Sequence, residues 1–320
     1  MNDSPEIAQS PARSSALVGG TELATMVSLI RREFWEHRIL WMAPLAVAAL
    51  LLVGAIFGRA QIGRALPGGA LVITPQEVRA IFAVTILGLG AAQYVTMSVV
   101  LWYYAADCLY AERRDRSILF WKSMPVSDGQ TVLSKVLVAL LIAPLGVYLV
   151  TAVTVLLTSG IWSLRELGGT AFPVFWDTRT WVQLEGATFV GLILASLWYA
   201  PITAYLMLVS ALARRNVQLW VFLVPIVAVI VERFAFGTHY LWTVILYRLH
   251  GGWQAGIFQY VGRLFNGHDL SSDAATLSPA PLQAMNLGHA FTNVDLWVGF
   301  AVAVALFFVA ARVRRYRDET

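Results

Sequence analysis

Hydrophobic positions in this chain of 320 residues are collected into long blocks rather than spread at short periods. A helix needs about 20 mostly apolar residues to cross roughly 30 Å of hydrocarbon. Four blocks meet this length. The last two are shorter but end beside acidic residues that can lie among lipid headgroups. We therefore predict six transmembrane helices. The blocks without Asp, Glu, Lys or Arg are residues 39–58, 80–106, 136–164, 186–213, 216–231 and 296–311.

Composition supports a membrane protein and excludes an ordinary soluble domain. The chain is 58% hydrophobic and 13% charged, whereas soluble domains carry about 25% charged residues. The expected fold is therefore all-α and polytopic, with one transmembrane domain over residues 22–317. Residues 1–21 have no long apolar run and are rich in Ser, Pro and Ala. Such a composition predicts a disordered tail.

The distribution of Lys and Arg sets the expected orientation. If the N-terminus is cytoplasmic, 15 of the 23 Lys and Arg residues fall on the cytoplasmic side. Because cytoplasmic loops carry an excess of Lys and Arg, both termini are predicted to be cytoplasmic. This orientation explains the net charge of +4. Basic residues divided among membrane edges give no support for nucleic-acid binding.

Residues 22–38, before the first span, carry apolar side chains at helical spacing and charged side chains on the other side. This pattern is typical of an amphipathic helix that lies on the inner membrane surface. The alternative is an extension of the first span into water. The apolar positions are Leu23, Met26, Val27, Ile30 and Phe34, and the charged ones are Arg31, Arg32, Glu33 and Glu36.

The largest predicted cytoplasmic loop, residues 107–135, places four large apolar residues where water is expected. These residues, Ile118–Trp121, either dip into the membrane surface or form a docking knob for another protein, and composition does not separate the two. Ser127 and Gln130 have the spacing of a capping box, which predicts the start of a helix leading into the third span.

The predicted outer segment, residues 232–293, separates the fifth and sixth spans. Its first part is aromatic and apolar but interrupted by charge, so it could hold short re-entrant or interfacial helices. Glu232 and Arg233 lie at its membrane edge, where they either pair near an outer gate or take a plain interfacial position. The second part is rich in Ser, Ala, Pro and Gly and is expected to be an exposed loop.

Polar side chains inside the spans fall on shared helical faces. They either line a substrate path or only bond to a neighbouring helix and their own backbone. The candidate path residues are Gln93, Thr96, Tyr103, Thr151, Thr154, Ser196, Tyr199 and Thr203.

The chain lacks the motifs of a nucleotide or metal site. A Walker A motif ends in Gly-Lys-Ser/Thr, but Lys122 and Lys135, the only lysines, follow Trp121 and Ser134. The single cysteine and the widely spaced histidines give no metal-binding pattern. The chain is therefore not expected to be an enzyme or to hold a cofactor. If it uses ATP, another subunit must bind it.

Six spans, cytoplasmic termini, an amphipathic helix before the first span and a charged loop after the second resemble the permease subunits of ABC-2-type transporters. The closest local match is Glu112–Ser127, ERRDRSILFWKSMPVS, followed by Ser134-Lys135. In that family an acidic and basic helix, a Leu-Pro-Val/Leu-Ser-like turn and a downstream Ser-Lys follow the second span. Here Met124 stands where Leu is common.

The resemblance implies the membrane subunit of a bacterial ABC exporter in the inner membrane. It implies a dimer with a second permease copy or homologue, surrounded by membrane lipids, and a cytoplasmic ABC ATPase that binds ATP and Mg. It further implies that a coupling helix in the 107–135 loop docks into that ATPase, and that residues 234–265 form re-entrant gate helices. The coupling residues would be Glu112, Arg113, Arg114, Asp115, Arg116, Ile118, Leu119, Phe120, Trp121, Lys122 and Pro125.

A path poor in charge suits a lipid-like or amphipathic compound, or a drug or peptide. Two alternatives remain open. An ATP-independent secondary transporter or channel would be expected to have buried charges in its spans or repeated halves with broken helices. A membrane sensor or assembly scaffold is compatible with everything in the sequence.

Overall fold

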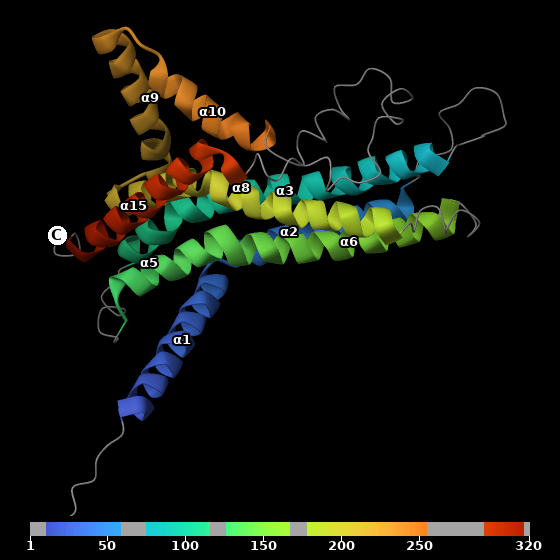
Figure 1. The fold of residues 1–320 in the computed structure, drawn as a ribbon, viewed down its shortest axis with the longest axis horizontal. Coiled ribbons are helices and arrows are strands. Elements are labelled where there is room, and N and C mark those ends of the chain that lie inside the picture. The colour runs from blue at the N-terminus through green and yellow to red at the C-terminus, as the bar shows by residue number, and fades with distance from the viewer. Residues whose placement is uncertain (1–10, 59–74, 116–125, 167–177, 255–290, 317–320) are drawn as a thin grey trace, which may run out of the picture.

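The computed structural model describes residues 11–58, 75–115, 126–166, 178–254 and 291–316 (Figure 1). Within these ranges the regular structure is entirely helical, and six helices are long and apolar enough to cross a membrane. The chain is thus a multi-pass membrane protein, as the apolar blocks predict. The candidate spans are Ile39–Phe57, Ile86–Arg114, Asp128–Arg165, Trp181–Leu212, Val217–Phe236 and Val294–Tyr316.

The helices form an elongated bundle from which two elements project (Figure 1). One projecting element is the N-terminal helix, and the other is the hairpin of α9 and α10. In chain order the helices are α1 (Pro11–Glu36), α2 (Ile39–Phe57), α3 (Pro75–Arg114), α5 (Asp128–Leu137), η2 (Val138–Ile142), α6 (Ala143–Glu166), α8 (Thr178–Leu212), α9 (Val217–Phe236), α10 (Tyr240–Gln254) and α15 (Val294–Tyr316).

α1 is a helix in its own right, separated from α2 by a turn at His37 and Arg38. It begins earlier than the sequence predicts, so residues 11–21 are helical rather than a disordered tail. Its expected polar face is only partly correct. Glu33 was placed on that face but is buried, because its carboxylate pairs with a cation inside the protein.

The third span consists of three consecutive helical segments. α5 begins with the predicted capping box: Ser127 Oγ accepts from the Gln130 amide, and the Gln130 side chain accepts from the Ser127 amide, both at 3.1 Å. The five residues Val138–Ile142 then form a π-helix just before Pro144. In an α-helix the proline ring would clash with the carbonyl of Leu140. The wider π turn relieves that clash.

Several helices are longer than a bilayer requires. The 40 residues of α3 extend over about 60 Å at about 1.5 Å per residue, which is twice the hydrocarbon thickness. Figure 1 shows α15 along one half of the bundle and α2 along the other. Side chains fix this stagger: Arg165 near the end of α6 donates to the Ala55 carbonyl of α2 at 2.8 Å, whereas Arg314 of α15 bonds to Asp128 at the start of α5.

Small residues allow α8 and α15 to approach closely. Ala200 and Ala204 on α8 and Ala303 on α15 are fully buried and form one cluster. In membranes, where lipid tails are as apolar as side chains, such small residues favour helix association because backbones come close enough for dense packing. The larger core, which includes Met97, Tyr104 and Met207, joins α3, α5 and α8.

α9 and α10 form a helical hairpin at a glycine turn. Gly237 has φ 67°, a left-handed conformation that glycine adopts without steric cost, and its amide bonds to the Arg233 carbonyl at 3.2 Å. α9 points away from the bundle and α10 runs back toward it (Figure 1). A helix of 15 residues, Tyr240–Gln254, thus occupies the start of the segment where short helices are predicted. Residues 255–290 lie outside the described part.

Enlarging Ala303 should disrupt the contact between α8 and α15. We expect Ala303→Leu to lower stability by about 1–3 kcal/mol, because overpacking a dense interface forces side chains and backbone apart. Ala305→Leu is the matched control, since Ala305 lies on the exposed side of the same helix. The measurement is the thermal midpoint of the purified protein in detergent. Equal midpoints for the two variants would contradict this packing.

Candidate functional site

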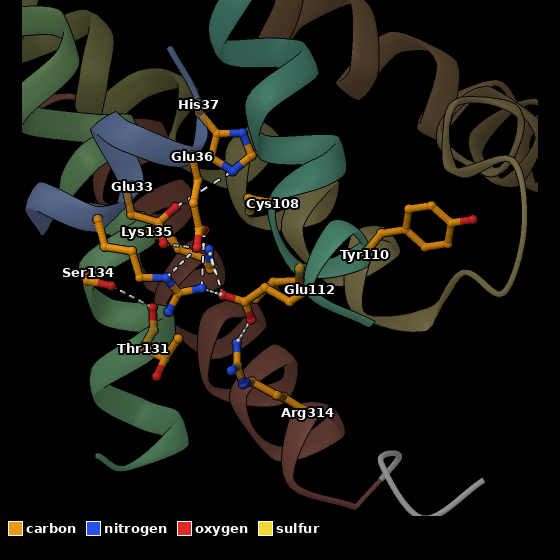
Figure 2. A network of polar contacts seen from close by, with 12 residues as sticks. Glu33, Glu36, His37, Cys108, Tyr110, Glu112, Thr131, Ser134, Lys135 and Arg314 are labelled. Atoms are coloured by element: carbon orange, nitrogen blue, oxygen red, sulfur yellow. Dashed lines mark hydrogen bonds and ion pairs between the residues drawn. The ribbon is translucent and has the colours of Figure 1, made fainter. Parts of the chain in front are cut away.

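Four helices bring charged side chains together at one end of the bundle, here called the charged end. They are the end of α1, the end of α3, the short helix α5 and the end of α15 (Figure 2). α3 and α5 are the helices that flank the predicted coupling loop. The side chains at the centre, here called the ion-pair cluster, are Arg32, Glu33, Glu112, Lys135 and Arg314.

Lys135 is the centre of the ion-pair cluster. Its Nζ lies 2.7 Å from an oxygen of Glu33 and 3.1 Å from an oxygen of Glu112, and its side chain is 0% exposed. Each contact bridges elements far apart in the sequence, because Glu33 belongs to α1 and Glu112 to α3. One ammonium group therefore joins α1, α3 and α5.

Glu112 accepts from three cations at once. Besides Lys135, Arg32 Nη2 lies 2.7 Å from the same carboxylate oxygen, and Arg314 Nη1 bonds to the other oxygen. Arg314 also pairs with Asp128 at 3.1 Å. The cluster thereby extends to α15. The two helices that flank the loop, α3 and α5, are thus both linked to α1 and α15.

The second oxygen of Glu33 is also occupied. The Tyr104 hydroxyl of α3 donates to it at 3.0 Å, and His37 packs edge-on against the Tyr104 ring with centroids 4.9 Å apart. Burial lowers the pKa of His37 below its ordinary value of 6.5, and the nearby Lys135 charge acts in the same direction, although the Glu33 carboxylate opposes them. A lowered pKa keeps the ring neutral at neutral pH.

These carboxylates fit an ion-pair network better than a metal centre. Glu33, Glu36 and His37 could in principle present three ligand atoms within 4.8 Å of one another. Lys135 and Tyr104 already take both oxygens of Glu33, and Arg32 holds Glu36 at 2.7 Å. A metal ion would have to displace these hydrogen-bond and ion-pair partners, so the arrangement favours an ion-pair network over coordination chemistry.

The predicted coupling residues divide between the interior and the surface. Glu112 was expected at a docking surface, but it points into the protein because three cations surround it. Arg113 donates to the carbonyls of Ser210 and Ala213 at 2.5 and 2.9 Å, where a cation satisfies the last carbonyls of α8. Arg114 is half exposed.

Arg114 and its partners form the exposed part of this helix end. Its Nε lies 3.0 Å from Asp115, and its Nη1 lies 3.9 Å from Asp107. Exposed pairs of this kind contribute at most about 1 kcal/mol and exchange partners easily. The remaining predicted coupling residues lie outside the described residues: Arg116, Ile118, Leu119, Phe120, Trp121, Lys122 and Pro125.

Several predicted path hydroxyls bond to their own helix. Thr96 donates to the Ala92 carbonyl at 2.8 Å, Thr154 to Val150 at 2.7 Å and Thr203 to Tyr199 at 3.2 Å. These bonds reach back four residues, the local pattern that needs no ligand. They agree with the packing alternative for these positions.

The other path candidates differ widely in burial. Gln93 and Thr151 are buried, and neither amide atom of Gln93 has a partner among the described residues. Tyr103 is exposed, Ser196 is half-buried, and the Tyr199 hydroxyl donates to the Leu249 carbonyl of α10 at 3.2 Å. Gln93 and Thr151 remain the best placed of the set for an internal polar path.

Glu232 and Arg233 serve the α9–α10 turn and do not pair with each other in the described structure. Glu232 accepts from Thr238 at 2.6 Å and from the amides of Tyr240 and Leu241 at 2.7 and 2.8 Å. It therefore caps the start of α10, where a carboxylate satisfies free amides. Arg233 Nη1 lies 2.6 Å from His239 Nε2.

α10 is fastened to the bundle by aromatic and polar contacts. Trp198 Nε1 of α8 donates to the Arg248 carbonyl at 2.9 Å, and the Arg248 guanidinium lies 4.6 Å from the Trp198 ring centroid. The Tyr247 hydroxyl donates to Asp295 of α15 at 2.9 Å. These contacts, rather than Glu232 and Arg233, hold the hairpin against the spans.

Sequence reasoning missed most of the ion-pair cluster. Arg314 entered only as a positive charge that marks orientation, and Glu33 only as part of a polar helix face. Lys135 entered as such a charge and as part of the Ser-Lys that follows the loop motif, with no buried partner expected. A usable signal was present, because charges of both signs stand at several span ends predicted to share one side of the membrane. Which of them pair depends on helix packing.

Comparisons with known proteins assign no family to this chain. No protein-family model, no curated protein and no solved structure matches it. The function is therefore inferred from the residues and geometry of the chain itself.

Removing the charge of Lys135 should destabilise the charged end. We expect Lys135→Met to cost about 3–5 kcal/mol, because it leaves buried carboxylates without their cation. Arg114→Met is the matched control and should cost at most about 1 kcal/mol, since its ion pairs are exposed. Thermal midpoints in detergent measure both. Adding Glu33→Gln to Lys135→Met should recover part of the loss, and strictly additive effects would contradict the pairing.

The lowered pKa of His37 predicts a loss of stability on acidification. The unfolded chain takes up this proton near pH 6.5, whereas the folded chain resists it. The contribution is therefore present above about pH 6.5 and lost as pH falls through the lowered folded pKa. We expect the thermal midpoint to fall less between pH 7.5 and 5.5 in His37→Gln than in the wild type. His250→Gln, at an exposed position on α10, should keep the wild-type profile.

Proposed function

We propose that the chain is the membrane-spanning permease subunit of a bacterial ABC transporter. In this proposal it lies in the inner membrane with both termini in the cytoplasm, pairs with a second permease, and exports a lipid-like, amphipathic, drug or peptide compound. A separate cytoplasmic ATPase binds ATP and Mg. The resemblance of Glu112–Ser127 to the ABC-2 loop motif and the geometry of the charged end support this function.

The observation that carries the proposal is the linkage of both loop-flanking helices through Lys135. Glu112 stands two residues before the end of α3, and Lys135 lies in α5 after the loop. Their ion pair and the contacts to Glu33 and Arg314 tie the loop to α1 and α15. A push on the loop would therefore move four helices as one body.

The third span contains a point where such a movement could be taken up. The π-helix Val138–Ile142 and Pro144 follow the ion-pair cluster directly. Both interrupt the regular helical hydrogen bonds, and bends of long helices concentrate at these features. α5 can then tilt with the loop while α6 keeps its packing against α2. Pro201 in α8 offers a second such point.

The exposed charges beside the loop suit a cytoplasmic partner. Arg114, Asp115 and Asp107 present both signs of charge at the end of α3. The aromatic pair Phe120 and Trp121 follows in the sequence. Aromatic anchors surrounded by charge are the residues from which protein interfaces take most of their binding energy.

The test is reconstitution with a candidate ABC ATPase, sought first among the coding sequences that adjoin that of this chain. Trp121→Ala should weaken co-purification about tenfold or more, since a buried aromatic anchor contributes about 2 kcal/mol or more. Trp220→Ala, on the exposed side of α9, is the matched control and should keep wild-type binding. Both variants should reach the membrane in wild-type amounts.

A second arm separates docking from force transfer. Lys135→Met with Glu33→Gln should still bind the ATPase but lose most ATP-dependent export from vesicles, because α5 is no longer tied to α1 and α3 through the Lys135 ammonium group. Unchanged ATPase binding by Trp121→Ala, or export that continues without ATP, would overturn the proposal and favour an ATP-independent transporter.

A further inference from the structure

A cavity of about 410 Å³ lies at the charged end, between the start of α5 and the end of α15. It borders the ion-pair cluster, because Asp128 and Arg314 contribute to its wall and bond to each other at 3.1 Å. The cavity is thus next to the cluster but separate from its buried centre. Other lining residues are Ser127, Thr131, Phe308, Arg312 and Arg315.

Two arginines give the cavity positive charge that the described protein does not neutralise. Arg314 is held by carboxylates. Arg312 and Arg315 line the same cavity and form no ion pair with any described residue. Arg312 instead lies 5.2 Å from the Phe308 ring centroid. Guanidinium groups without a carboxylate partner favour phosphate oxygens, which they bind through charge-assisted hydrogen bonds with planar geometry.

An apolar part of the wall beside the arginines indicates an amphipathic ligand. Phe308, Ala311 and Val126 line the cavity beside the arginines. Phe308 continues an exposed apolar side of α15 that includes Val304. This helix is a candidate membrane span, so its exposed apolar side faces acyl chains, and its arginine-rich end lies where headgroups lie. Basic pockets between membrane helices at this depth bind anionic headgroups.

We propose that this cavity binds the phosphate headgroup of an anionic phospholipid, with its acyl chains along α15. The guanidinium groups of Arg312 and Arg315 hold the phosphate, and Phe308 contacts the start of the apolar part. The inference goes beyond the proposed function, since it requires neither the ATPase nor a transported compound. Lipid in this position lies beside the Asp128–Arg314 ion pair that joins α5 and α15 at the edge of the ion-pair cluster.

The experiment measures binding of short-chain phosphatidylglycerol to the purified full-length protein in uncharged detergent. Arg312→Gln combined with Arg315→Gln should weaken binding about tenfold or more, because each basic residue near an anionic surface contributes about 1 kcal/mol. The matched control is Arg214→Gln with Arg215→Gln. These two arginines are also adjacent to a span at the charged end and exposed, but they do not line the cavity. The control should bind as the wild type does.

Two further arms identify the ligand. Phosphatidylcholine of the same chain length should bind at least tenfold more weakly than phosphatidylglycerol, and inorganic phosphate alone should compete only weakly. The lipid proposal is overturned if the Arg312 and Arg315 variant binds normally, or if the Arg214 and Arg215 variant loses as much. Full competition by inorganic phosphate would also overturn it, and would identify a free-phosphate site. Unchanged elution and thermal midpoints without lipid establish that both variants fold.

Discussion

The buried ammonium group of Lys135 is the constraint on which the charged end of the protein depends. An ammonium group removed from water requires anionic partners, and Glu33 and Glu112 supply them from two other helices. α1, α3 and α5 therefore meet in one arrangement, since moving any of them leaves a buried charge unpaired. Arg314 extends the same constraint to α15.

This constraint contributes more to the uniqueness of the packing than to net stability. A buried ion pair often does no better than apolar residues of similar size, because desolvation offsets the attraction between the charges. Contacts such as those between Ala204 and Ala303 are close, but they lack the directional bonds that would specify one register. Lipid tails also compete for the same apolar surfaces. The acyl chains of lipid cannot replace the partner of a buried charge. The ion-pair cluster therefore fixes the register of helices whose apolar faces alone would determine that register only weakly.

More of the fold than of the candidate site could be predicted from the sequence. Six spans follow from counting apolar residues, because the bilayer imposes one length on every helix, and Ser127 and Gln130 mark a helix start through purely local bonds. Glu33 and Lys135 are 102 residues apart, and only the packing of three helices brings them together. Glu112 was assigned to the docking surface because it begins the segment that resembles the loop motif, although side chains of adjacent helical residues point in different directions.

Arg113 and Arg114 show what this directionality means for the loop motif. Arg113 turns inward to the last carbonyls of α8, and Arg114 turns outward to exposed carboxylates. A run of charges beside a loop therefore contains two kinds of residue, those that hold the helix end to the bundle and those that face the surroundings. In the proposed coupling mechanism, force applied to the outward set would reach the bundle because the inward set is fixed. The buried charges of the motif would then be as necessary to that mechanism as the exposed ones.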